Sequence, residues 1–246
     1  MSFGAGARLF LDGARAARRP AVSRYIWLPA LLSLAVIAAG LATAFAYTGD
    51  LADYLTGQLP ASLNFLGAIL GPLLYALSVL IGAWLFGFVA VLLASPFLGD
   101  LAIEVERDQF GDAPGHDPSF WHGVASAMAR EIRKLGYYLP RLLVVFLLTL
   151  VPGINAVAPF VWFGFGAWTL AVQFCDYPTE NRGRPFRETL DLLRRDRGAA
   201  FGYGSCATLA LAIPLLNFLM IPVAVAGGTL LHRRLAEGTS LRSDPS

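Results

Sequence analysis

The residues of this chain that could do chemistry are arginines and carboxylates at the ends of long apolar segments. A guanidinium beside a helix N-terminus suits a tetrahedral oxyanion, because the guanidinium fork, free N–H groups and the positive end of the helix dipole share one ligand. Patterns for catalysis are missing: His116, His122 and His232 have no cysteine or carboxylate partner at metal-ligand spacing, and no nucleophile elbow or phosphate-binding loop occurs. We therefore expect no enzyme activity, no cofactor and no metal.

The composition is that of an integral membrane protein. Hydrophobic residues make up 56% of the 246 residues and charged residues 15%, and the mean hydropathy is +0.59, whereas about a quarter of the residues of a soluble domain are charged. Cys175 and Cys206 lie in or beside apolar runs, so we expect packed small side chains rather than a disulfide or redox pair. The net charge of +2 is mild and does not suggest a nucleic acid partner.

Two apolar segments are long enough to cross a bilayer, which takes about 20 helical residues. Residues 25–47 carry no charge and have aromatic residues at both ends, and residues 73–98 lead into a charged helical stretch over residues 100–110. Residues 1–24 form a basic lead-in, either an amphipathic helix on the membrane surface or a disordered tail. In the first case the side chains at the interface are Phe3, Leu9, Phe10 and Leu11.

Two further apolar regions are interrupted by uncharged turns. Residues 142–151 precede the Pro152-Gly153-Ile154-Asn155 stretch, and an arm of about ten helical residues is only about 15 Å long, half of the hydrocarbon core. Residues 199–231 are interrupted similarly between Pro214 and Pro222, with Asn217 at the position that matches Asn155. Repeated broken helices often line a transport pathway, so both asparagines are pathway candidates; two ordinary turns are the alternative.

The arginines and the lysine predict the topology. They lie in the N-terminal segment, in residues 100–141, in the most basic loop, residues 176–197, and after residue 231, whereas residues 48–72 and both turns hold none. The positive-inside rule therefore places both termini in the cytoplasm. The charges fit six full spans as well as two spans plus two partial hairpins.

Several short stretches resemble the CysZ-type sulfate permeases, in that family's order and at its spacing. The most specific is Cys175-Asp176-Tyr177-Pro178 followed by Arg184-Pro185-Phe186. Others are Ser-Pro-Phe at 95–97, Leu-Pro-Arg at 139–141, Pro-Gly-Ile at 152–154 and Pro-Leu-Leu-Asn at 214–217. The resemblance covers about residues 24–231. It implies an all-α integral membrane protein of two long spanning helices and two helical hairpins that only partly penetrate the membrane, assembled as a homo-oligomer.

The resemblance also implies an activity, sulfate entry through the bacterial inner membrane for cysteine synthesis. The expected organisation is the lead-in of residues 1–24, one membrane domain of residues 25–231 and a cytoplasmic tail of residues 232–246. The expected partners are sulfate or a related oxyanion and the lipid bilayer. A non-transporting membrane scaffold, or a transporter of a different anion with the same fold, is the alternative.

One departure from the family concerns its anion site. The family usually has a Gly-x-Arg-Arg stretch before the first span, taken as a sulfate-binding site, and Ala21-Val22-Ser23-Arg24 stands there instead. By resemblance, Ser23 and Arg24 with the N–H groups of Val22 and Ser23 would bind the anion. The loss of one arginine predicts weaker sulfate binding or another substrate, and a simple interface anchor is the alternative role of Arg24.

Five further charged residues are pathway candidates because they match family positions or could pair with such a residue. Glu104 and Glu106 point about 200° apart on a helix, so at most one faces a given partner. We expect one of them to pair with an arginine, with Arg141 and Arg187 as the candidates, or else both to be solvated at a helix end. Arg184, in the Arg-Pro-Phe stretch, is the remaining candidate.

Overall fold

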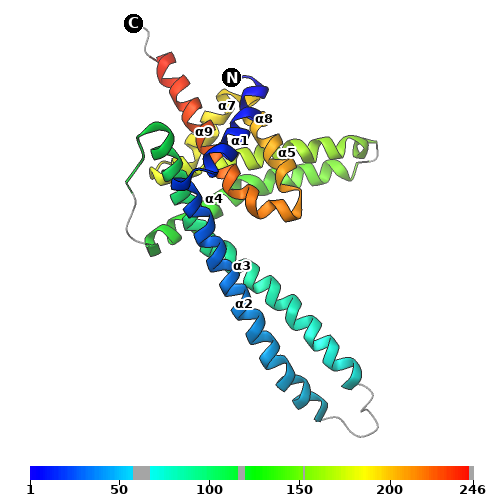
Figure 1. The fold of residues 1–246 in the computed structure, drawn as a ribbon. Helices are drawn as coiled ribbons and strands as arrows, with labels where there is room; N and C mark the ends of the chain where they lie inside the picture. Colours follow the sequence, from blue (N-terminus) through cyan, green and yellow to red (C-terminus); the bar gives the residue numbers. More distant parts are fainter. Residues whose placement is uncertain (58–66, 116–119, 152, 244–246) are drawn as a thin grey trace. The chain divides into compact units, whose positions relative to one another are not determined.

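The computed structural model describes residues 1–57, 67–115, 120–151 and 153–243, and within these ranges every regular element is a helix (Figure 1). The elements are α1 (Phe3–Ala17), α2 (Pro20–Gly57), α3 (Gly67–Phe110), α4 (Phe120–Thr149), the 3₁₀ helix η2 (Ile154–Val157), α5 (Ala158–Cys175), α6 (Tyr177–Asn181), α7 (Phe186–Arg195), α8 (Arg197–Leu211) and α9 (Pro214–Ser243). The all-α prediction is confirmed for the described residues.

The chain forms two compact units, and the smaller comprises Trp27–Ser95. It holds residues 27–57 of α2 and 67–95 of α3. These two stretches lie side by side and are joined by a hydrogen bond of 2.8 Å between the Thr48 and Ser78 hydroxyls. The rings of Phe45 and Tyr75 stack at 6.2 Å between centroids. Large apolar side chains point outward along both helices, among them Leu31, Leu34, Leu73, Leu80 and Ile81. An exterior of this kind suits lipid or a protein partner rather than water.

The larger unit comprises Met1–Ile26 and Pro96–Ser246, and α1 packs into it against α8 and α9. Glycines allow the close approach: a Cβ at Gly6 would overlap the Ala199 carbonyl group, and one at Gly13 would overlap the backbone of Gly227. Leu9 and Phe10 are buried by this packing. The expectation that both lie at a lipid interface is therefore wrong, because their apolar faces contact the protein itself.

The first interrupted hairpin is confirmed, although its first arm is longer than expected. Helix α4 runs unbroken through Pro140 and Arg141 to Thr149, and α5 returns beside it (Figure 1). Between them lie a bend, Gly153 with a φ of +89°, and η2. A positive φ suits glycine because it lacks a Cβ. The break thus lies at the predicted place; Pro152 and the Asn155 side chain are outside the described residues.

The second interruption lies directly before Pro214, at the start of the predicted stretch and not within it. Helix α8 ends at Leu211, and α9 begins at Pro214 and continues through Pro222. The reason is that proline suits the first position of a helix, where its missing N–H costs nothing, so Pro214 starts the helix rather than breaking one. Asn217 therefore lies on α9, its side chain outside the described residues, whereas Asn155 lies in η2. The two asparagines are not structurally equivalent.

The most basic segment, residues 176–197, is largely helical rather than a loop, because it contains α6 and the amphipathic α7. Phe186, Leu190 and Leu193 are buried on one side of α7, and its arginines are exposed on the other.

Within the described residues, one helical stretch, Ala158–Asn181, has the length and hydropathy of a membrane span. Leu34–Asp50 and Ile69–Gly82 are shorter apolar helices. The predicted crossings by residues 25–47 and 73–98 stay predictions, although both segments are helical.

The packing of α1 generates a stability prediction. Gly6→Ala should lower the free energy of unfolding by about 1–3 kcal/mol, because the added methyl group meets backbone that has no room to move. Gly4→Ala, on the same helix, meets nothing within 4 Å and should be neutral or stabilising by up to about 1 kcal/mol. Thermal unfolding of the detergent-purified variants tests the pair. Equal melting temperatures would contradict the close packing of α1.

Candidate functional site

Charged side chains from the start of α2 and the end of α3 meet in what we name the junction cluster, Arg19, Arg24, Glu104, Arg107 and Asp108. All five belong to the larger unit. Arg24 Nη2 lies 3.5 Å from Glu104 Oε1, Arg107 Nη1 donates to Glu104 Oε2 at 2.7 Å, and Arg19 Nη1 donates to Asp108 Oδ2 at 2.7 Å. Glu104 and Asp108 are four residues apart on α3 and share one face of that helix.

The backbone part of the expected anion site is wrong. The N–H groups of Val22 and Ser23 donate to the Arg19 carbonyl oxygen at 3.0 and 2.8 Å, so neither is free for a ligand. The reason is that α2 begins at Pro20, and its first turn is closed by the carbonyl before it. Val22 is fully buried, and the Ser23 hydroxyl donates to the Pro20 carbonyl oxygen at 3.3 Å.

Arg24 remains as an accessible cation. Its side chain is 64% exposed. Its guanidinium lies 4.9 Å from the centroid of the Tyr25 ring, and Nη2 donates to the Tyr25 hydroxyl at 3.4 Å. These contacts use one end of the guanidinium and leave the other end for a ligand.

Glu104 and Glu106 both pair with arginines, but not with the two candidates. Glu106 is fully buried and accepts from Arg182 Nη1 at 3.0 Å. Burial raises the pKa of the Glu106 carboxyl, and Arg182 acts against that shift. Arg141 instead donates to the Tyr137 carbonyl oxygen at 2.6 Å. Arg187 is exposed and has no ion pair in the described part of the chain.

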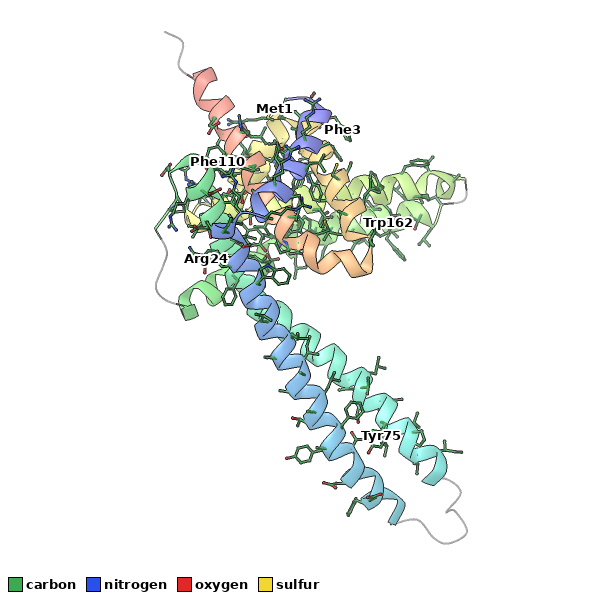
Figure 2. The ribbon with its side chains drawn as sticks, viewed as in Figure 1. Met1, Phe3, Arg24, Tyr75, Phe110 and Trp162 are labelled. Carbon is green, nitrogen blue, oxygen red and sulfur yellow. The ribbon has the colours of Figure 1, made fainter. Side chains whose placement is uncertain are left out.

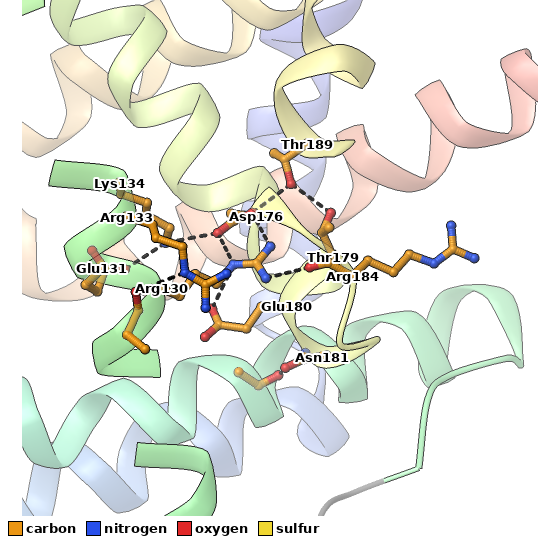
Figure 3. A network of polar contacts seen from close by, with 12 residues as sticks. Arg130, Glu131, Arg133, Lys134, Asp176, Thr179, Glu180, Asn181, Arg184 and Thr189 are labelled. Carbon is orange, nitrogen blue, oxygen red and sulfur yellow. Dashed lines mark hydrogen bonds and ion pairs between the residues drawn. The ribbon is translucent and has the colours of Figure 1, made fainter. Parts of the chain in front are cut away.

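A second cluster was missed by the sequence reasoning and is centred on Asp176 (Figure 3). The Asp176 carboxylate is fully buried and accepts both arms of the Arg130 fork, from Nε and Nη2, at 2.6 Å each. It also accepts from the Thr189 hydroxyl at 2.7 Å and lies 3.1 Å from Lys134 Nζ. A buried carboxylate with this many donors ties α4 to the α5–α6 corner and to α7. We name this set, Arg130, Lys134, Asp176 and Thr189, the Asp176 cluster.

The contacts of the Asp176 cluster extend to α9 and to the segment before α7. The hydroxyl oxygens of Thr189 and Thr179 lie 2.8 Å apart, and Thr179 is 3.1 Å from His232 Nε2. Burial and the nearby Arg182 and Arg233 lower the pKa of His232 to about 4, so it is neutral at pH 7. Arg130 Nη1 donates to the Arg184 carbonyl oxygen at 2.7 Å, and the exposed Arg184 side chain pairs with Glu188 at 2.6 Å. Arg184 thus contributes to this site through its backbone.

A signal for the Asp176 cluster was present in the sequence. Arg130 and Lys134 are four residues apart and therefore share a helix face. Asp176 is the first charge after a long apolar run. The sequence does not show that these side chains meet in the fold, because Arg130 and Asp176 are 46 residues apart in the chain.

Comparison with known proteins decides the family. The family model described as "Sulfate transporter CysZ/Etoposide-induced protein 2.4" matches residues 9–222. The chain belongs to this family. Among its relatives is the "Sulfate transporter CysZ" of Pseudomonas aeruginosa (strain LESB58), 38% identical over 228 residues that cover 89% of this chain and 90% of the relative.

Proteins with the same printed name from other bacteria are similar over comparable lengths. That of Vibrio parahaemolyticus is 35% identical over 223 residues, which cover 89% of this chain and 90% of the relative. That of Pectobacterium atrosepticum is 34% identical over 229 residues, which cover 92% and 83%. In this member of the CysZ family, the Asp176 cluster coincides with the Cys-Asp-Tyr-Pro stretch that carries the resemblance most specifically. The geometry assigns that stretch a role in holding helices together.

The burial of Asp176 generates a second prediction. Asp176→Ala should lower the free energy of unfolding by about 3–5 kcal/mol, because it leaves Arg130 and Lys134 buried without their shared carboxylate. Asp191→Ala removes an exposed carboxylate that pairs with Arg194 at 3.3 Å, and should change stability by less than about 0.5 kcal/mol. Denaturant or thermal unfolding in one detergent measures both. A small loss for Asp176→Ala would mean that the cluster is hydrated in solution.

Proposed function

We propose that this chain is a sulfate permease or channel of the bacterial inner membrane, which supplies sulfate for cysteine synthesis. The observation that carries the proposal is similarity over most of the chain to bacterial proteins named "Sulfate transporter CysZ". The supporting chemistry is an accessible guanidinium, that of Arg24, in the junction cluster. Transport rather than catalysis follows from the same similarity.

We also propose the membrane arrangement of two long spanning helices, in α2 and α3, and two partly penetrating hairpins, with both termini cytoplasmic. Apolar side chains are exposed on the last turns of α4 and the first turns of α5, including Leu143, Phe146, Phe160 and Trp162 (Figure 2). After Arg141 only about eight residues of α4 remain, and they extend about 12 Å, less than half of the hydrocarbon core. A turn at that depth needs protein around it, which favours a homo-oligomer.

The anion-binding part of the proposal rests on Arg24, with Ser23 beside it. A charge-assisted contact contributes roughly 1.5–3 kcal/mol, equal to about a ten- to hundredfold change in affinity. Glu104, Glu106 and Arg184 stay pathway candidates, and the exposed Arg187 is a second cation available to an anion. Arg141 is occupied by its own helix turn, which makes it a weaker candidate.

The alternative, a carrier of a different anion or a non-transporting scaffold of the same fold, has one specific observation behind it. Ser23 stands where the family pattern has an arginine, and a serine hydroxyl supplies no charge. A site with fewer charges binds a divalent anion less tightly, so a monovalent substrate would fit the change.

Sulfate flux tests the function directly. Liposomes that contain the purified protein should take up labelled sulfate, and Arg24→Ala should reduce uptake at low sulfate by about ten- to a hundredfold. Arg24→Lys should recover only part, because an ammonium lacks the bidentate fork. Arg15→Ala is the control, since Arg15 is exposed and pairs locally with Asp12 at 2.5 Å. No uptake by the parent protein would exclude the permease and favour the scaffold.

The partial penetration of the hairpins has its own test. Single cysteines at Val157 and Ile213, both exposed and next to the two turns, are placed in a variant whose Cys175 and Cys206 are alanines. Turns that stop inside the bilayer should react slowly with a membrane-impermeant thiol reagent added outside. A cysteine at Asp50, which is exposed near the end of α2 and expected outside, is the positive control. Rapid labelling at both turns would show that the hairpins span the membrane fully.

A further inference from the structure

Two of the three arginines of the junction cluster, Arg19 and Arg24, lie at the start of α2. The expected anion site includes only Arg24. Arg19 directly precedes α2, and its carbonyl oxygen accepts the N–H groups of Val22 and Ser23. Its side chain reaches Asp108, while Arg24 reaches Glu104. Because those carboxylates are four residues apart on α3, their Cβ atoms are about 5–6 Å apart. The two guanidiniums are therefore brought to neighbouring positions on a single helix face.

Both guanidiniums keep free donors. The Arg19 side chain is 52% exposed and that of Arg24 64% exposed. Arg19 bonds only through Nη1, and Arg24 only through Nη2, among the contacts of the described residues. The remaining N–H groups of each guanidinium are available to an oxyanion, which accepts hydrogen bonds through several oxygens at once.

The carboxylates of the cluster also have other partners. Glu104 accepts from Arg107 at 2.7 Å, a shorter contact than the 3.5 Å to Arg24. Asp108 Oδ2 accepts from Gln109 Nε2 at 2.6 Å in addition to Arg19. Three guanidiniums face two carboxylates, so the cluster holds one unbalanced positive charge. Because Glu104 also pairs with Arg107, it does not fully neutralise the charge of Arg24.

We propose that Arg19 is the second arginine of the sulfate site in this chain, in the role that the arginine missing at Ser23 would have. The ligand class is a tetrahedral dianion, held between the guanidiniums of Arg19 and Arg24. Glu104 and Asp108 are internal competitors that occupy these guanidiniums when no anion is bound, and so set the affinity. Arg107 is a positioning residue, because it acts on the site through Glu104.

This inference rests on the proposed function, since it deepens the site at Arg24. It supplies the site with a second positive charge. Arg19 lies about one helical turn before Ser23, and the Ser23 N–H donates to the Arg19 carbonyl oxygen.

Isothermal titration calorimetry with sodium sulfate at constant ionic strength tests the proposal on the detergent-purified full chain. Arg19→Ala should weaken sulfate binding by about ten- to a hundredfold. The double variant Arg19→Ala with Ser23→Arg should recover most of that loss, because it returns an arginine to the neighbouring turn. Asp108→Asn should tighten binding by up to about fivefold, the weight of one exposed ion pair.

The matched control is Asp191→Asn, which makes the same change in net charge at an exposed pair with Arg194 and should leave sulfate affinity unchanged. If Arg19→Ala binds sulfate like the parent protein while Arg24→Ala binds it more weakly, the role of Arg19 is overturned and that of Arg24 stands. Equal tightening by Asp191→Asn and Asp108→Asn would reduce the effect to general electrostatics and overturn the site. A parent protein that binds no sulfate would contradict the proposed function and remove the Arg19 site with it.

Discussion

One buried carboxylate holds the larger unit together. Asp176 lies at the corner between α5 and α6, and the groups that satisfy it come from α4 and α7. An unpaired charge in such a place would cost several kcal/mol, and the cost is offset only when the donors converge with good geometry. The four side chains of the Asp176 cluster therefore fix the corner, the helices on either side of it and the direction in which α7 leaves the corner. Arg182, which pairs with the buried Glu106, lies between that corner and α7.

The other constraint is steric, and it acts on α1. Gly6 and Gly13 face the backbones of Ala199 and Gly227 with no space for a side chain. Close backbone approach of this kind is common where helices pack without a large apolar side chain between them. The start of α2 follows directly on α1, and both belong to the same compact unit as the end of α3. The packing of α1 therefore helps to bring Arg19 and Arg24 to α3 in a defined register. The anion site we propose depends on that register.

Much of the fold could be predicted from the sequence, and the failures have identifiable causes. Composition and apolar run lengths predict an all-helical membrane protein, and the uncharged Pro-Gly stretch predicts the turn between α4 and α5. The second turn was placed a few residues too late because proline has two opposite meanings, a helix breaker inside a helix and a helix starter at its first position, as at Pro214. At the site, Arg24 and the two glutamates were recognised from motifs. Their partners, and the burial of Glu106 and Asp176, depend on contacts across tens of residues that no local pattern contains.

The packing of α1 also has a consequence for biogenesis. The helix leaves the ribosome well before its partners on α8 and α9, which lie about 190–220 residues later in the sequence. At a synthesis rate of about 5–20 residues per second, that interval is about 10–45 s. During this time Leu9 and Phe10 have none of the partners that bury them in the finished protein. Assembly of the larger unit therefore cannot finish before α8 and α9 have been synthesised.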